Sequence, residues 1–482
     1  MSEALPKPLS LLDAEASGGD TAEGGFTFQE GVILSKLPGW LARDGFTAII
    51  REAMCDAEAS FHVPGSGLRR EGLEAKNYSL TPSPFWEEID TFRRLDASSP
   101  NPFQWFTLVS TGLSAQLEPL VNGLRRVRDP FAFYDKGSRV REQSYADYAE
   151  RVRKLEKGDD LAQFLFERVL IEPDWATAQA DAEALFRQRL ITHHPAFAEY
   201  PNSALTRAYQ SLLALVKSCK NRPITRSEIE MALTSALPTA MPLKWPPLRI
   251  HTALPGNVGP DGVLRLEWGK FFGGDTKGYP PPAEWETELV GGLVKLKDWI
   301  IATARQRRIH LSGSRRLSSS LAFGAVFSAV SGFAIAVENR NEVWMTDDHA
   351  TAQTPPYALT AELVEGEGSR LAVAIGIGRD VIRDVRAHFV AAGRPKTPIL
   401  SLNSTEPVLG AAHANAIARL IKDQLARSLA KTGTRAVDLF YAGPGPLALF
   451  LGHRLNATAP IQCFEWLSGG KYEPTCQLYP AT

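Results

Sequence analysis

Three residues in the first part of the chain have the types and spacing that phosphodiester hydrolysis requires. Glu74 and Lys76 are two positions apart, so both side chains project from one face if they lie on a strand. Asp56 lies 18 residues before Glu74, at the start of an apolar stretch that indicates the preceding strand. A hairpin between the two strands would bring Asp56 beside Glu74.

Two carboxylates at one end of a sheet suit Mg²⁺ (or Mn²⁺), which prefers oxygen ligands and keeps waters for a substrate phosphate. Asp56 and Glu74 are therefore the expected metal ligands, with Lys76 holding and polarising the attacking water and stabilising charge at phosphorus. Glu58 could share or take a ligand role, and Glu30 could add a further carboxylate. The alternative is a surface strand with an ordinary salt bridge, because the Glu-x-Lys spacing alone is common.

The elements expected around these residues have a mixed α/β order. We predict a helix over about 28–43, strands over 57–63, 70–77 and 104–110, and a helix over 86–94 between the last two strands. This order of helix, strands, helix and strand resembles the core of PD-(D/E)xK nucleases.

Two further stretches support this resemblance. The segment 24–31, Gly-Gly-Phe-Thr-Phe-Gln-Glu-Gly, is similar to the opening of the nuclease domain in bacterial anti-phage effectors, and Lys76-Asn-Tyr and Phe85-Trp-Glu-Glu-Ile match it downstream. The resemblance implies a restriction-endonuclease-like α/β core with a helical extension over 25–225, and a metal-dependent DNA endonuclease. The sequence departs from the pattern in having no proline before Asp56.

A basic cluster after this core is a candidate for gripping double-stranded DNA. Lysine and arginine contacts to phosphates would give salt-sensitive affinity without sequence preference. The alternative is a charged helix end with core aromatics between its charges. The cations are Arg125, Arg126, Arg128, Lys136, Arg139 and Arg141, and the aromatics are Phe131, Phe133 and Tyr134.

The composition bounds the function classes. The chain has 482 residues, of which 44% are hydrophobic and 22% charged, which excludes wholesale disorder and favours two or three domains. The 53 Lys and Arg against 54 Asp and Glu give a net charge of −1, so a polyanionic partner must be bound by local patches. Four cysteines without a Cys-x-x-Cys pair favour a reducing compartment over a disulfide framework or zinc site.

The ends of the chain and its apolar stretches favour a cytoplasmic protein. Residues 1–24 are polar, acidic and glycine-rich, which predicts a flexible tail rather than a signal peptide. Residues 317–337 carry no charge, but their serines and glycines favour a buried helix over 319–330 and a strand over 333–337 rather than a membrane span.

The second part of the chain, after a proline-punctuated stretch near 221–245, alternates strands and helices and contains a repeat. One unit runs from 309–313 through a helix with Gly324 to Trp344, and the other runs from 439–443 through a helix with Gly452 to Tyr472. The interval from glycine to aromatic is 20 residues in both. This repeat predicts two Rossmann-like halves with parallel sheets, although chance similarity of two βαβ units is the alternative.

Glycine-containing turns follow the expected strands, where ligands of α/β sheets bind. None is a complete dinucleotide fingerprint, so nicotinamide-dependent redox chemistry is weakly supported. Duplicated turns suit a ligand with several phosphates and bases, with arginines on the phosphates and aromatics on the bases. The candidates for binding are Gly313, Ser314, Arg315, Arg316, Trp344, Gly376, Arg379, Asn403, Gly443, Pro444 and Trp466, with Tyr441 and Phe464 as further stacking residues.

Residues 240–482 resemble the SAVED domain of CBASS anti-phage systems. The resemblance is carried by Leu311-Ser-Gly-Ser, Gly324, Trp344, Phe440-Tyr-Ala-Gly-Pro and Gly452. It implies two fused CARF-like halves that bind a cyclic oligonucleotide, with a cyclic trinucleotide expected. The whole chain resembles a nuclease–SAVED effector that works with a CD-NTase and cuts DNA after ligand-driven oligomerisation; a nucleotide sensor without nuclease activity is the alternative.

Overall fold

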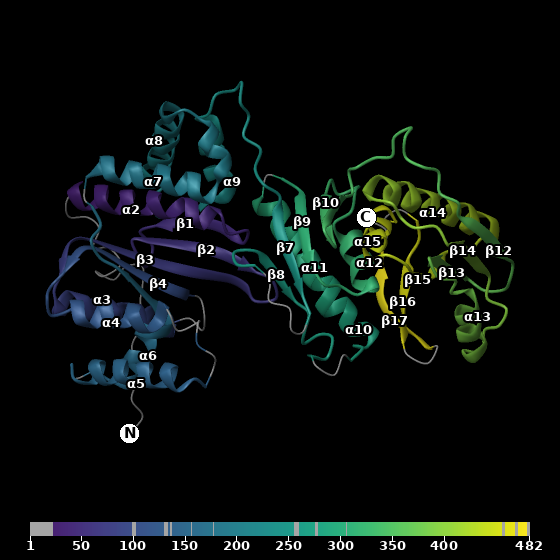
Figure 1. Ribbon diagram of the computed structural model, residues 1–482, viewed down its shortest axis with the longest axis horizontal. Helices are drawn as coiled ribbons and strands as arrows, with labels where there is room; N and C mark the ends of the chain where they lie inside the picture. The colour runs from purple at the N-terminus through teal and green to yellow at the C-terminus, as the bar shows by residue number, and fades with distance from the viewer. Residues whose placement is uncertain are drawn as a thin grey trace. The chain divides into compact units, whose positions relative to one another are not determined.

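The computed structural model describes residues 23–98, 103–129, 134, 137–155, 157–176, 178–254, 260–274, 278–304, 306–455, 458–467 and 471–479. The expected tail lies outside these residues up to position 22, as do Phe131, Phe133 and Lys136. The chain divides into two compact units, Met1–Lys244 and Trp245–Thr482 (Figure 1). Each unit is described by itself.

The N-terminal unit is built on a six-stranded mixed sheet with the order β5-β4-β3-β2-β1-β6. Strands β1, β2 and β3 form an antiparallel meander, whereas β4 and β5 continue the sheet parallel to β3. The strands are β1 (Phe46–Arg51), β2 (Ala57–Val63), β3 (Gly67–Leu80), β4 (Phe103–Leu113), β5 (Val169–Glu172) and β6 (Ile224–Thr225).

Helices cover both faces of this sheet (Figure 1). On α3 the apolar residues Phe85, Ile89, Phe92 and Leu95 recur every three or four positions and are buried, so one stripe of the helix packs on the sheet. One face carries α2 (Glu23–Leu41), α7 (Gln179–His193), α8 (Asn202–Ser218) and α9 (Arg226–Ser235). The other carries α3 (Pro82–Ser98), α4 (Glu118–Arg128), α5 (Arg139–Arg153) and α6 (Asp159–Arg168).

The C-terminal unit contains two Rossmann-like sheets, with the strand orders β11-β10-β9-β7-β8 and β12-β14-β13-β15-β16-β17. In both sheets the inner strands are parallel, and β11, β12 and β17 pair antiparallel with their neighbours. The prediction of an α/β unit with Rossmann-like sheets is confirmed. The strands are β7 (Leu248–Ala253), β8 (Leu264–Glu267), β9 (Arg308–Gly313), β10 (Ala334–Asn339), β11 (Glu342–Met345), β12 (Thr360–Val364), β13 (Arg370–Ile377), β14 (Ile399–Ser404), β15 (Ala436–Ala442), β16 (Ile461–Leu467) and β17 (Lys471–Leu478).

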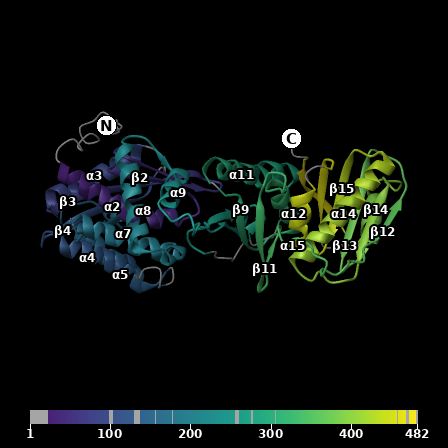
Figure 2. The ribbon, with the colours of Figure 1, turned by 90° about the horizontal axis from the view of Figure 1, so that it is seen from above.

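The two units of the predicted repeat meet where α12 (Leu317–Val326) of the first crosses α15 (Gly445–Arg454) of the second. The two helices lie side by side in both views (Figures 1 and 2). A Cβ on Gly324 would come within 2.1 Å of the Leu449 carbonyl oxygen, and a Cβ on Gly452 within 2.1 Å of the Leu321 carbonyl oxygen. Each glycine thus meets the residue three positions before the other glycine. The two repeats therefore pack against each other through equivalent positions.

The remaining helices differ in part from the expected ranges. The uncharged stretch forms α12, which ends at Val326 rather than at 330, and then β10. Among the described residues, no helix has the length and hydropathy of a membrane span. The other helices of this unit are α10 (Pro282–Glu284), a π-helical turn (Trp285–Val290), α11 (Gly291–Thr303), α13 (Ile382–Ala391) and α14 (Ala411–Thr432).

Candidate functional site

The hairpin of β2 and β3 brings Asp56 beside Glu74. Ala57 lies opposite Leu73 in the antiparallel register, so the next pair outward is Asp56 and Glu74. The backbone N–H of Asp56 donates a hydrogen bond to Glu74 Oε2 at 3.2 Å. The N–H of Ala75 donates in turn to Asp56 Oδ2 at 2.8 Å. The two carboxylates are thus held at one point of the sheet by backbone groups.

Lys76 completes this cluster together with two residues that the sequence analysis did not select. Its Nζ lies 2.9 Å from Glu74 Oε1 and 2.7 Å from an oxygen of Glu88 on α3. On the other side of the sheet, Gln29 Nε2 of α2 donates to Asp56 Oδ1 at 2.8 Å. Gln29 and Glu88 both lie in the segments that carried the nuclease resemblance, which was the available signal for them.

Burial and crowding of charge shift the ionisation of this cluster. Burial, and then the neighbouring Glu74 carboxylate, raise the pKa of Asp56 well above its ordinary value. The same two causes raise the pKa of Glu88. Burial by itself would lower the pKa of Lys76, but Glu74, Glu88 and Asp56 together outweigh burial and raise it. The lysine is therefore a protonated ammonium at neutral pH, suited to binding anions rather than to accepting protons.

The donor set fits a hard cation with few protein ligands. Asp56 and Glu74 offer carboxylate oxygens, which Mg²⁺ prefers, and leave positions for water and phosphate. Glu58 instead accepts a bond from the Met54 N–H, and Glu30 pairs with Arg51 at 2.9 Å. In the described part of the chain, no group of three or more His, Cys, Asp or Glu side chains is arranged to hold a metal ion.

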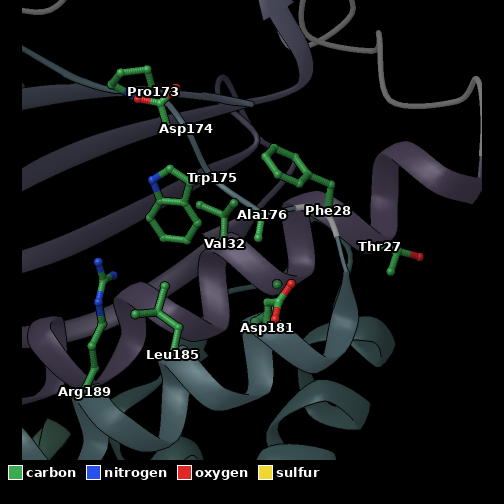
Figure 3. Close-up of a pocket in the computed structure, with 12 residues that line it drawn as sticks. Thr27, Phe28, Val32, Pro173, Asp174, Trp175, Ala176, Asp181, Leu185 and Arg189 are labelled. Carbon is green, nitrogen blue, oxygen red and sulfur yellow. The ribbon is translucent and has the colours of Figure 1, made fainter. Parts of the chain in front are cut away.

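A hollow of about 370 Å³ lies between α2, α7 and the segment that follows β5 (Figure 3). Phe28, the neighbour of Gln29, lines one side, and Trp175 projects into it from the loop after β5. The Arg189 guanidinium carbon lies over the Trp175 ring, 5.2 Å from the ring centre. Lys36 Nζ also lies over this ring, 5.7 Å from its centre. Three separate segments of the chain contribute these residues, so no local sequence pattern groups them.

Two of the arginines expected to grip DNA are used inside the fold. Arg125 Nη2 donates to the Ile171 carbonyl at 3.4 Å, and Arg128 Nη1 donates to the Val169 carbonyl. Both carbonyls belong to β5, the strand at one edge of the sheet. Arg125 and Arg128 therefore cover this edge.

A pocket of about 360 Å³ in the C-terminal unit gathers five of the expected ligand-binding residues, Arg315, Arg316, Arg379, Trp466 and the stacking candidate Tyr441. Its walls come from the C-terminal ends of β9, β13, β15 and β16 and the segments that follow them, as is general for α/β sheets. The pocket is also lined by Tyr279, Glu465 and Tyr472, which were not selected from the sequence as binding residues.

Arg316 and Glu465 form the most constrained part of this pocket. The Arg316 guanidinium carbon lies 4.1 Å from the centre of the Tyr279 ring and 4.6 Å from that of Phe272. Glu465 Oε2 is 3.8 Å from Arg316 Nη1, and its Oε1 accepts a bond from the Ser318 N–H in the first turn of α12 at 2.9 Å. Burial raises the pKa of Glu465.

Arg379 and Arg315, the other two arginines of the pocket, differ in exposure and in their hydrogen bonds to the backbone. The Arg379 guanidinium stacks on Trp466 at 5.3 Å and is exposed. Arg315 Nη1 donates to the carbonyls of Ser312 at 2.9 Å and Gly313 at 3.1 Å, and burial lowers its pKa to about 10. Arg379 is therefore the more available of the two for a phosphate.

The remaining predicted residues do not line this pocket. Trp344 is 5% exposed within the hydrophobic core, where its indole N–H binds Glu342. A Cβ on Gly376 would come within 2.3 Å of the Arg379 carbonyl, so that glycine shapes the turn that places Arg379. Gly313, Ser314, Asn403, Gly443 and Pro444 lie in the strand ends and turns nearby, and Pro444 accepts a hydrogen bond from the Tyr441 hydroxyl at 2.8 Å.

Comparison with known proteins locates a sensor domain in this unit. Residues 293–478 match the SAVED family model, described as a SMODS-associated sensor domain fused to various effectors. Over 480 residues the chain is 28% identical to CD-NTase-associated protein 4 of an Acinetobacter strain, covering 97% of this chain and 99% of the relative. The relative of the same name from Moraxella osloensis is 26% identical over 472 residues, with the same two coverages.

Solved structures of similar length share the fold. The Cap4 SAVED/CARF-domain receptor of Acinetobacter baumannii, solved with the cyclic trinucleotide 2'3'3'-cAAA, superposes with a TM-score of 0.82 at 25% identity. The superposition covers 96% of this chain and 100% of the receptor chain. The same receptor with 3'3'3'-cAAA gives a TM-score of 0.81 at 25% identity, with coverages of 95% and 99%. Together these similarities support a CBASS effector with a SAVED sensor domain.

Proposed function

We propose that this chain is an anti-phage effector whose N-terminal unit is a metal-dependent endonuclease for double-stranded DNA, activated by a cyclic oligonucleotide bound in the C-terminal unit. The observation that carries the proposal is the cluster of Asp56, Glu74 and Lys76 in a chain that also matches a sensor domain. Neither part alone would give a regulated nuclease.

The receptor part of the proposal rests on the chemistry of the pocket beside β15. Arginines bind phosphate oxygens through charge-assisted hydrogen bonds, and aromatic rings stack on bases. Arg316, Arg379, Tyr441, Trp466 and Tyr472 supply both kinds of group around one pocket. The similar Acinetobacter baumannii receptor has been solved with the cyclic trinucleotides 3'3'3'-cAAA and 2'3'3'-cAAA, so a cyclic trinucleotide is the expected ligand class.

The nuclease part follows from the cluster on β2 and β3. Asp56 and Glu74 would hold Mg²⁺, which when bound lowers the pKa of a ligand water and neutralises charge on the phosphate. Lys76, protonated and 2.9 Å from Glu74, binds a phosphate oxygen or the attacking water and stabilises negative charge at phosphorus. Glu88 holds the ammonium in this position before substrate arrives. Gln29 orients the Asp56 carboxylate.

Regulation requires that ligand binding in the C-terminal unit change the DNA-cleavage activity of the N-terminal unit. We propose that the ligand drives homo-oligomerisation, which brings nuclease units together on one duplex, and that a CD-NTase supplies the ligand. A double-strand cut needs two phosphodiester hydrolyses, one on each strand, and paired units provide both.

The proposal is tested with purified protein, Mg²⁺, supercoiled plasmid and a panel of cyclic di- and trinucleotides. The expected result is conversion to linear and shorter DNA only with a ligand that the protein binds. Ligand binding without cutting under all metal conditions would support a sensor without nuclease activity instead. Cutting that is equal with and without every bound ligand would contradict the regulatory part.

A further inference from the structure

A basic groove lies between α4 and α5, outside the cluster on β2 and β3. It has a volume of about 500 Å³. Three arginines line it, Arg126 from α4 and Arg141 and Arg151 from α5, against one carboxylate, Asp147. The side chains of Arg126 and Arg151 are exposed, so both guanidinium groups can reach a ligand in solution.

Two features show that this groove is built rather than incidental. A Cβ on Gly123 would come within 3.3 Å of Arg151 Nη1, so the glycine leaves room for the guanidinium to lie against α4. Tyr148, 2% exposed, lines the same groove, and no described residue makes a hydrogen bond with its buried hydroxyl. A buried hydroxyl without a partner costs free energy, and a ligand oxygen in the groove would satisfy it.

Helices α4 and α5, whose residues line the groove, lie on the face of the sheet that also carries α3 (Figure 1). One hydrophobic cluster joins this layer: Phe85 of α3, Leu124 of α4 and Tyr148 of α5 are all part of it. The groove is therefore fixed rigidly to the helix that holds Lys76.

We propose that Arg126, Arg141, Arg151 and the Tyr148 hydroxyl bind a phosphate of the DNA backbone. The inference rests on the proposed nuclease function and extends it, because it places a contact outside the hydrolytic cluster. Planar guanidinium groups match phosphate oxygens in pairs, and the hydroxyl donates to a third oxygen. A contact to a phosphate carries no sequence information, so the site positions the duplex without sequence preference.

The test measures binding of a labelled DNA duplex in EDTA, which prevents cleavage, at several salt concentrations. For the double variant R126A/R151A we expect at least tenfold weaker binding and a salt slope shallower by about one, since each neutralised phosphate contributes about one to the slope. Y148F should weaken binding severalfold and leave the melting temperature unchanged or higher. R153A removes an exposed arginine of the same helix that pairs with Asp159, and it should bind as the wild type does.

The outcomes separate this site from the nuclease proposal. Wild-type affinity and salt slope in R126A/R151A, in a protein that still cuts plasmid, would overturn the groove as a DNA contact. Equal losses in R153A would also overturn it, because they would reflect general charge. A wild-type protein that neither binds nor cuts DNA would overturn the proposed nuclease function as well.

Discussion

Asp56 and Glu74 are joined twice across the β2–β3 hairpin: the Asp56 N–H binds the Glu74 carboxylate, and the Asp56 carboxylate binds the N–H of the residue that follows Glu74. The sheet itself thus forces two negative side chains together. Such crowding destabilises the protein unless a cation relieves it. Lys76 relieves part of it, and a bound metal ion would relieve more.

Lys76→Ala should abolish DNA cleavage, with a loss of at least about a hundredfold, because the site loses the ammonium that lies beside Glu74 and Glu88. Plasmid cleavage with ligand and Mg²⁺ measures this effect. Ligand affinity, measured by calorimetry, should stay at the wild-type value. Lys154→Ala, which removes an exposed lysine of the same unit, is the control. Retained cleavage in Lys76→Ala would remove the lysine from the mechanism.

Asp56→Asn should raise thermal stability in metal-free buffer at neutral pH while removing cleavage. Burial and Glu74 raise the pKa of Asp56, so the ionised form is the one that the fold disfavours. The free-energy cost of ionising Asp56 in the folded protein grows as pH rises from the ordinary carboxyl pKa through the raised pKa of the folded state. It vanishes in acid, where Asp56 is protonated in both the folded and the unfolded protein. The stability gap between variant and wild type should therefore close as pH falls. A constant gap would contradict this assignment.

Mg²⁺ should raise the melting temperature of the wild type and have little effect on Asp56→Asn, because a ligand that binds the folded state stabilises it by mass action. Thermal unfolding with increasing MgCl₂ measures this difference. An equal response of both proteins would place the metal elsewhere.

Glu465→Gln should tighten binding of a cyclic trinucleotide. The Glu465 carboxylate occupies the first-turn N–H of Ser318 and lies 3.8 Å from Arg316, both of which attract phosphate. Removing its charge frees Arg316 for the ligand and weakens the bond that the Ser318 N–H donates, and we expect severalfold higher affinity by calorimetry. Arg316→Ala should weaken binding by tenfold or more. Weaker binding in Glu465→Gln would show that the carboxylate instead holds Arg316 in place.

Gly324→Ala should destabilise the C-terminal unit by about 1–3 kcal/mol or more, the usual cost of forcing extra atoms into a packed core. Its Cβ would meet the Leu449 carbonyl oxygen at 2.1 Å, and backbone must move. Gly292→Ala on α11 is the matched control, since nothing lies within 4 Å of its Cβ. Chemical denaturation compares the two. Equal stabilities would contradict the described helix crossing.

The sequence was most informative where backbone geometry decides the outcome. The sequence around Glu74 and Lys76 predicted a strand, and the predicted hairpin with β2 does bring Asp56 beside Glu74. The equal spacing after Gly324 and Gly452 predicted a repeat, and in the structure both glycines lie at a helix crossing that is too close for a Cβ.

Partner choice by long side chains could not be predicted. Arg125 and Arg126 are neighbours with the same chemistry, yet one covers the β5 edge and the other lines a groove. Trp344 is suited both to stacking and to a core, and tertiary packing put it in the core. Glu88 and Glu465 acquire their roles from residues on other elements, which no local pattern encodes.

The most direct test of the account compares wild type, Lys76→Ala and the double variant Arg316→Ala/Arg379→Ala in one assay, with plasmid cleavage and binding of the same cyclic trinucleotide both measured. We predict that the wild type binds and cuts, that Lys76→Ala binds without cutting, and that the pocket variant does neither. A pocket variant that cuts as well as the wild type at the same ligand concentration would contradict the account.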